Sequence, residues 1–162
     1  MERQVRVERI TQATPELLDV MSGWMWNWWG KDMGYSMEKL RCYLTRHINP
    51  RLTVPQTYVL FENGVPAGMF QLSMSDLDVR PDVYPWLINV YVAKERRGQG
   101  YFYQMMQALD GAMEQIGLKR LYLYTRHVGL YERCGFSFVE EFQTYLSPGD
   151  TQRLYVRQGR PM

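Results

Sequence analysis

Residues that could bind an anion stand together at Arg97-Gly98-Gln99-Gly100, where a strand-like run passes into paired glycines. The run ends with Val90, Tyr91 and Val92, whose side chains are β-branched or aromatic. After the glycines, apolar residues recur at the spacing of one helix face, at Phe102, Met105, Met106, Leu109, Met113 and Ile116. A glycine turn that opens a helix leaves backbone N–H groups free at the positive end of the helix dipole. The stretch therefore predicts a site for a phosphate or pyrophosphate.

Two common kinds of nucleotide site do not fit this turn. A nucleotide-hydrolysing P-loop has Lys and then Ser or Thr after its second glycine, whereas Tyr101 and Phe102 stand there. A dinucleotide fingerprint needs a third glycine and an acid about twenty residues on, but Tyr103 and Lys119-Arg120 occupy those places. The residues alone leave two interpretations open, another anion-binding turn or a basic surface turn that only joins a strand to a helix.

Length and composition indicate how many domains the chain forms, which partners it could bind and in which compartment it is expected. A chain of 162 residues, 46% hydrophobic and 22% charged, suits one globular domain over residues 1–162. Its net charge of +2, without a Lys or Arg block, does not predict nucleic-acid binding. Cys42 and Cys134 lack metal-ligand spacing, so no metal site is expected. Without an apolar leader or a membrane-length run in these residues, a cytoplasmic protein that does not contact membranes is expected.

The first part of the chain predicts a strand and two helices. Apolar residues alternate over 5–10, as in a short strand. Thr14-Pro15 predicts the start of a helix, and the helical period continues until Gly30. A second helix is predicted from Ser36 until Asn49-Pro50 stops it.

The rest of the chain predicts a sheet with one long helix. Asn63-Gly64, between apolar runs at 58–61 and 65–72, is a strong hairpin signal, and Gly68 predicts a bulge. The later elements are a strand buried on both faces, the long helix, a strand, a short helix and two strands, at 86–92, 102–116, 121–124, 128–134, 136–145 and 152–157. This order predicts a mixed α/β architecture around one sheet.

Four of the five tryptophans fall between Trp24 and Trp29. At helical spacing Trp24 and Trp28 fall on the buried face, whereas Trp26 and Trp29 project elsewhere. Two interpretations stay open, a tryptophan-rich core helix or an aromatic wall of a substrate pocket. Exposed members of the cluster would also suit a partner-binding surface. The substrate-pocket candidates are therefore Trp24 and Trp28, together with Asn89 in the buried strand.

Two separated motifs resemble those of the GCN5-related N-acetyltransferases (GNAT). Arg97-Gly98-Gln99-Gly100 resembles the acetyl-CoA pyrophosphate loop, and Leu130-Tyr131-Glu132-Arg133-Cys134-Gly135-Phe136 resembles the later LYE-x-x-GF motif. The Asn63-Gly64 hairpin with Val65-Pro66-Ala67-Gly68 is similar to the family's second and third strands, so the likeness spans nearly the whole chain. The resemblance implies an α/β (α+β) single-domain fold, with a mixed central sheet of about six to seven strands and helices on both faces. The implied order is β-α-α-β-β-β-α-β-α-β-β.

The resemblance also implies roles for the matching residues. Backbone groups of Val90, Tyr91 and Val92 would pair with the pantetheine arm of acetyl-CoA. Backbone N–H groups of the loop would hold its pyrophosphate, at Arg97, Gly98, Gln99, Gly100 and Tyr101. Tyr131 matches the family tyrosine that lies near the thioester sulfur and can protonate the leaving thiolate. The implied chemistry is direct acetyl transfer to a neutral amine, without a metal.

The sequence departs from the family pattern around both motifs. Glu95 stands where Gln or Arg is frequent, and Tyr124 stands where Asn is frequent. Phe102 replaces a third glycine, which predicts a tighter space beside the cofactor. None of these changes removes a backbone donor, so coenzyme A binding is still expected.

The general base is not assigned by the sequence. Many family members use an acid on the fourth strand, yet Trp86 to Val92 contains none. Asp76, Asp78 and Asp82 precede that strand, and His127 lies shortly before the tyrosine motif. A helix-end or surface role suits His127 equally well, and solvent or a chain of waters is a further alternative.

These features favour an acetyl-CoA-dependent N-acetyltransferase that acts on a primary amine of a small molecule. The aromatic first helix favours a compact pocket, and the lack of a charged patch argues against histone-like or nucleic-acid substrates. Aminoglycoside-type polyamines would need an acidic pocket, for which only the Asp76 to Asp82 loop is suggestive. A protein N-terminus or lysine is another acceptor class.

A non-catalytic acyl-CoA-binding module is the alternative from a different functional class. The missing strand acid favours it, and the retained Tyr131 opposes it. Family members often dimerise, so the resemblance is compatible with a homodimer, although no interface is indicated.

Overall fold

The computed structural model describes residues 2–76, 80–143 and 149–160. Its elements are, in order, β1 (Val5–Arg9), α1 (Pro15–Met25), the π-helical turn η1 (Trp26–Gly30), α2 (Met37–Arg46), β2 (Gln56–Glu62), β3 (Val65–Ser73), β4 (Trp86–Val92), the 3₁₀ turn η2 (Lys94–Arg96), α3 (Tyr101–Ile116), β5 (Arg120–Thr125), the 3₁₀ turn η3 (Glu132–Cys134), β6 (Ser137–Gln143) and β7 (Thr151–Gln158). The predicted order of strands and helices is confirmed. Part of the predicted strand at 136–145 lies outside the described residues.

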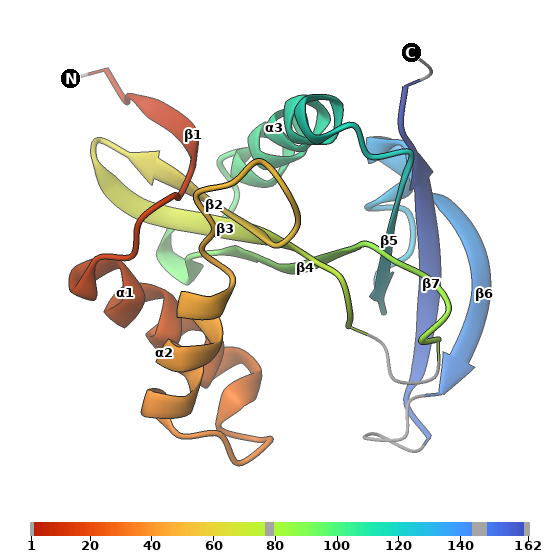
Figure 1. The fold of residues 1–162 in the computed structure, drawn as a ribbon, viewed down its shortest axis with the longest axis horizontal. Coiled ribbons are helices and arrows are strands. Elements are labelled where there is room, and N and C mark those ends of the chain that lie inside the picture. Colours follow the sequence, from red (N-terminus) through yellow and green to blue (C-terminus); the bar gives the residue numbers. More distant parts are fainter. Residues whose placement is uncertain (1, 77–79, 144–148, 161–162) are drawn as a thin grey trace.

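The strands form one seven-stranded sheet in the order β1-β2-β3-β4-β5-β7-β6. All neighbouring pairs are antiparallel except β4 and β5, which run parallel. In Figure 1, α3 covers one face of the sheet, while α1 and α2 lie on the opposite face. The mixed sheet with helices on both faces agrees with the predicted fold class. Within the described ranges, no helix is long and apolar enough to cross a membrane.

Side chains of β2 alternate between two cores. Tyr58 and Leu60 pack in the core beneath α3, whereas Val59 packs in the core beneath α1 and α2. The helices bury their apolar faces in these cores, α3 through Met105 and Leu109 and the other two helices through Met21, Met25, Leu40 and Leu44. The sheet is thereby covered by α3 on one face and by α1 and α2 on the other.

Short polar side chains and glycines mark the helix and hairpin ends. Thr14 Oγ1 accepts a hydrogen bond from the backbone N–H of Leu17 (3.3 Å), as the predicted helix start requires. In the β2–β3 hairpin, Asn63 and Gly64 both have positive φ (+51° and +80°), as in a type I′ turn. The β2–β3 register skips Ala67, so the bulge lies one residue before the predicted position.

Two helical predictions are wrong in extent. α2 ends at Arg46 and has His47 as its C-cap residue, so the helix stops before Asn49-Pro50. The helix predicted over 128–134 is only the turn η3. Both carboxylate oxygens of Glu132 accept from the backbone N–H of Gly129 (3.1 Å), which holds this segment as an irregular turn.

The first helix changes its winding at η1, and this corrects the prediction for its tryptophans. A π-helical turn holds more residues than an α-helical one, so side chains after it change face. Trp28, predicted on the buried face, is 46% exposed. Trp29 faces the sheet instead, and its Nε1 donates to Asn89 Oδ1 (3.2 Å). Gly30 is buried at this turn, where a Cβ would lie 2.7 Å from Leu40 Cδ1.

Candidate active site

The sheet opens between β4 and β5. These strands pair only at Trp86 and Tyr122, after which they diverge (Figure 1). On its other edge, β4 stays paired with β3 as far as Val92. Among the described strands, the edge of β4 that faces β5 therefore has no partner beyond Trp86. The predicted donor-binding residues Val90, Tyr91 and Val92 lie in this open segment.

A bulge in β4 lies at the start of the opening. Between Ile88 and Tyr91, two residues of β4 face the single residue Phe70 of β3. The first of the two, Asn89, has a positive φ of +50°. Such a bulge bends its strand and increases its twist. Residues 89–92 are only half-buried, so the prediction of a strand covered on both faces holds for its first part alone.

The glycine turn has the geometry of an anion site. Gly98 and Gly100 have φ of +81° and +79°, and nothing lies within 4 Å of a Cβ at either position. Glycine is needed there for the left-handed backbone and not for space. The N-terminus of α3 has no side-chain cap, so its first N–H groups stay available together with those of Gln99 and Gly100. The ring of Tyr101, 2% exposed, anchors the turn in the core.

The two arginines before the glycines have different environments. Arg96 forms an ion pair with Glu62 (3.3 Å), whose side chain is 8% exposed, and so fixes the turn to β2. Arg97 is exposed, its Nε donates to Val92 O (3.0 Å), and its guanidinium lies 5.4 Å from the Tyr91 ring centroid. Of the two arginines, Arg97 is thus the more exposed to solvent, and it lies beside β4.

Tyr131 is brought to the start of α3. Its ring packs edge-on against Phe102 (5.4 Å between centroids) and Phe136 (5.7 Å). It shares the core beneath α3 with Val90 and Val92. Burial raises the pKa of the Tyr131 hydroxyl above its ordinary value. The Phe102 ring, which stands where the family has a third glycine, directly borders the tyrosine.

Aromatic side chains from α1 and η1 line the other side of β4. Trp24 and Trp28 each lie 5.4 Å from the ring centroid of Tyr91. Trp24 is half-buried and Trp28 exposed, so the pair is not part of a sealed core. These contacts support the wall interpretation of the tryptophan cluster.

Among the acids before β4, Asp76 has the properties of a proton acceptor. Asp82 is paired with Arg80 (2.9 Å), which lowers the pKa of that carboxyl, and Asp78 lies outside the described residues. Asp76 is exposed at the surface, yet the surrounding protein desolvates its carboxyl and raises the pKa to about 7. Burial raises the pKa of Tyr43 to about 12, and the nearby charge of Asp76 adds to this effect. Tyr43 was not predicted as a site residue.

His127 lies in a surface loop. His127 is exposed, its backbone N–H donates to Thr125 Oγ1 (3.1 Å), and its carbonyl accepts from the Tyr155 hydroxyl (3.3 Å). These contacts suit a surface residue in a fixed loop. In the part of the chain that the structure describes, no group of three His, Cys, Asp or Glu side chains could hold a metal ion.

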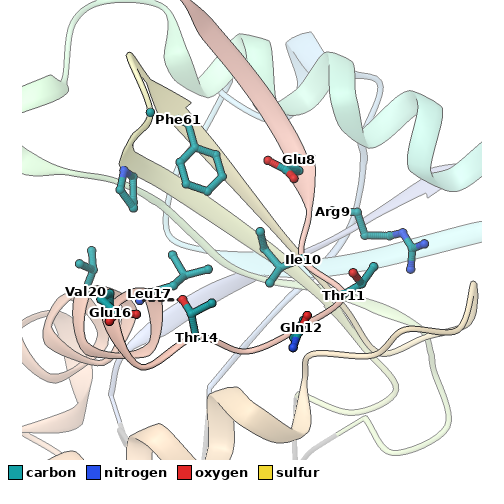
Figure 2. A pocket seen from close by; sticks show the side chains of 12 residues that line it. Glu8, Arg9, Ile10, Thr11, Gln12, Thr14, Glu16, Leu17, Val20 and Phe61 are labelled. Carbon is teal, nitrogen blue, oxygen red and sulfur yellow. Dashed lines mark hydrogen bonds between the residues drawn. The ribbon is translucent and has the colours of Figure 1, made fainter.

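A cavity of about 430 Å³ lies at the β1 end of the sheet (Figure 2). Its lining comes from β1, the start of α1 and the β2–β3 hairpin, with Ile10, Leu17 and Phe61 apolar and Glu8 and Glu16 acidic. None of the predicted site residues lines it. Two strands separate β1 from β4 in the sheet, so this cavity is distinct from the opening beside β4.

A family model for GNAT acetyltransferases matches residues 20–136, which include the glycine turn and the Tyr131 motif. The chain belongs to the GNAT acetyltransferase family. GNAT enzymes use acetyl-CoA as the acyl donor, and one structural relative was solved with coenzyme A bound. No curated protein sequence matches the chain significantly.

Solved structures share the fold at low sequence identity. An aminoglycoside 6'-N-acetyltransferase in complex with coenzyme A is 13% identical, with a TM-score of 0.77 over 97% of this chain and 98% of the other. An aminoglycoside 6'-acetyltransferase type Ii is 14% identical, with a TM-score of 0.75 over 97% and 99%. An acyl-CoA N-acyltransferase from Pseudomonas aeruginosa is 18% identical, with a TM-score of 0.65 over 96% and 99%. These likenesses establish the GNAT fold.

The residues of this chain fit acetyl-CoA. The pantetheine arm carries amide groups that need hydrogen-bond partners, and the edge of β4 after Trp86 offers backbone groups that no described strand pairs with. The pyrophosphate needs N–H donors and positive charge, which the turn at Gly98 and Gly100 and the start of α3 supply. Both features lie on consecutive elements, so one ligand can reach both.

Proposed function

We propose that this GNAT protein is an N-acetyltransferase that acetylates a primary amine of a small molecule by direct transfer, with residues 1–162 as one acetyltransferase-like domain. The observation that carries the proposal is the opening between β4 and β5, which pair only at Trp86 and Tyr122. The opening is bordered by the glycine turn, by Tyr131 and by the aromatic wall. This arrangement supports a site that combines donor-binding groups, a proton donor and an acceptor surface.

Acetyl-CoA supplies the acetyl thioester to this site. The backbone of Val90, Tyr91 and Val92 would hold the pantetheine arm, and the N–H groups from Arg97 to Tyr101 would hold the pyrophosphate. The first N–H groups of α3 have no side-chain cap, which supports this role. Holding the donor along a strand edge fixes the direction from which an amine can approach, and such orientation provides much of the rate enhancement in direct transfer.

Tyr131 is the proposed proton donor to the leaving sulfur. Its phenol is neutral at physiological pH, as that of an ordinary tyrosine is, and burial raises the pKa of its hydroxyl further. Phe102 and Phe136 hold the ring edge-on from two sides and so limit its movement. As the carbon–sulfur bond breaks, the phenol can donate its proton to the thiolate.

Asp76 is the proposed acceptor of the amine proton. A primary amine must lose a proton to attack the thioester carbon and to form a neutral amide. Desolvation by the surrounding protein raises the pKa of the Asp76 carboxyl to about 7, so this group can exchange protons near neutral pH. It belongs to the segment that follows β3 and interacts electrostatically with Tyr43, which packs against η1 through Trp29.

The acceptor is proposed to be a small molecule with one amine on an apolar or aromatic body. Trp24, Trp28 and Tyr91 offer aromatic surface beside the donor strand. Polyamines favour several free carboxylates, but Asp82 is already paired with Arg80. The net charge of +2 also gives no support to strongly charged macromolecular substrates.

A non-catalytic acyl-CoA-binding module is the second candidate function. The observation in its favour is that Trp86 to Val92 carries no acid. Such a module would bind coenzyme A at the same open strand edge and would show no turnover with any amine.

Thiol release from acetyl-CoA across a panel of primary amines tests the proposal. Turnover with at least one amine, together with loss of turnover in Tyr131→Phe while coenzyme A binding is retained, is the expected result. Tyr103→Phe is the matched control, because it also removes a phenol hydroxyl, and Tyr103 is a 43% exposed residue of α3 outside the proposed site. Coenzyme A binding without turnover on any amine would favour the binding module.

A further inference from the structure

Asn89 takes a backbone conformation that needs support from the rest of the protein. A non-glycine residue with φ of +50° inside a strand is strained by about 1 kcal/mol or more, although Asn tolerates it better than most residues. The bulge at this residue lies between the paired start of β4 and its open end. The conformation of Asn89 therefore sets the direction in which the Val90 backbone continues.

The side-chain amide of Asn89 is held on both of its polar atoms. Its Oδ1 accepts from Trp29 Nε1 (3.2 Å), and its Nδ2 donates to the Tyr43 hydroxyl (3.1 Å) and to Gln71 Oε1 (2.8 Å). Gln71 is fully buried and donates in turn to Thr57 Oγ1 (3.1 Å). The network fixes which way the amide faces, because only its oxygen can accept the indole N–H.

Trp29 reaches Asn89 because the helix becomes π-helical at η1. Its ring packs edge-on against Tyr35 (5.6 Å) and Tyr43 (6.0 Å), so the indole is itself held in place. The same segment contacts Tyr91 through Trp24 in α1 and Trp28 in η1. The segment from α1 to η1 thus contacts β4 at residues 89 and 91, on either side of Val90.

We propose that Trp29 and Asn89 are positioning residues for the acyl donor in this chain. The hydrogen bond from the indole N–H to the amide oxygen holds the β4 bulge, so that the Val90 backbone faces the donor. It also ties the donor strand to the aromatic wall on the acceptor side. The inference rests on the proposed function for its catalytic meaning, but its first consequence is for coenzyme A binding.

Titration with coenzyme A tests the proposal in two variants, each of which removes one partner of the hydrogen bond between Trp29 and Asn89. Trp29→Phe keeps an aromatic ring and loses the N–H, and Asn89→Gly keeps access to positive φ and loses the amide. Each single variant is expected to weaken coenzyme A binding about fivefold, as for loss of one hydrogen bond. The double variant is expected to bind no worse than Asn89→Gly alone, because Asn89→Gly already removes the hydrogen bond that Trp29→Phe removes.

Trp26→Phe is the matched control, since Trp26 lies on the same turn and packs near Lys31 (5.5 Å). It is expected to bind coenzyme A as the unaltered protein does. In turnover assays, Trp29→Phe should raise the KM for acetyl-CoA and leave the KM for the amine unchanged, a split that general destabilisation does not produce.

Unchanged coenzyme A affinity in Trp29→Phe, or losses that multiply in the double variant, would overturn the proposal. If Trp29→Phe does not fold, Asn89→Gly decides, with unchanged affinity overturning the proposal. Because binding is measured without an amine, absence of turnover in the unaltered protein would contradict the proposed function and leave this test intact.

Discussion

Replacing Asp76 by Asn should change the pH dependence of acetyl transfer in a defined way. With a pKa of about 7 for this carboxyl, about one tenth is ionised at pH 6 and about nine tenths at pH 8. Only the ionised form can accept a proton from the amine. As the pH rises over this interval, ionisation of Asp76 alone should therefore increase the kcat/KM of the unaltered enzyme about tenfold.

The amine substrate also loses a proton as the pH rises, and this contribution must be separated. Deprotonation of the amine affects the unaltered enzyme and Asp76→Asn equally. The ratio of their kcat/KM values therefore isolates the effect of ionising the Asp76 carboxyl. Thiol release measured from pH 5.5 to 8.5 should give a ratio that rises through pH 7 and reaches about 100 at pH 8. Asp82→Asn, in the same segment and ion-paired with Arg80, is the control and should keep the unaltered profile. A ratio for Asp76→Asn that stays flat across pH 7 would refute the assignment.

Three further substitutions follow from the geometry. Gly100→Ala should lower the free energy of unfolding by about 1 kcal/mol because φ is +79° there, and should weaken coenzyme A binding in calorimetry as the turn relaxes. Gly30→Ala should cost about 1 to 2 kcal/mol in denaturant unfolding, since its Cβ would lie 2.7 Å from Leu40 Cδ1; unchanged stability would show that the core adapts there. Trp28→Ala should lower the melting temperature only modestly, because the residue is 46% exposed, and should raise the KM for the amine through loss of the Tyr91 contact.

Signals that act over a few residues predicted much of the fold. Thr14-Pro15 and Asn63-Gly64 have strong local preferences, and the structure has the expected cap and turn at both. The glycines at 98 and 100 take the positive φ that the anion-binding interpretation of the turn required. The family resemblance added the expectation of helices on both faces of the sheet, which no local pattern indicates.

The details of the acceptor side could not be read from the sequence because they depend on a change in helical winding. Regular helical spacing places Trp28 inside, whereas the π-helical turn places Trp29 there. The bulge in β4 carried one available signal, since Asn89 is the only polar residue in an otherwise apolar strand and needs buried partners. Its partner Tyr43 comes from a different helix, and a sequence pattern does not show such a long-range contact.

The single pairing between β4 and β5 has a consequence for cooperativity. It divides the hydrogen-bonded network of the sheet into a block of β1 to β4 and a block of β5 to β7, connected through the chain by α3. A donor that bonds to the open edge of β4 adds interactions across this boundary, so its binding should stabilise the native state by about 2.7 kcal/mol at a hundredfold excess over Kd. Amide hydrogen exchange should report the same event locally, as slower exchange along residues 89–92 when coenzyme A is bound. The substrate would then act as a missing strand of the fold as well as the source of the acetyl group.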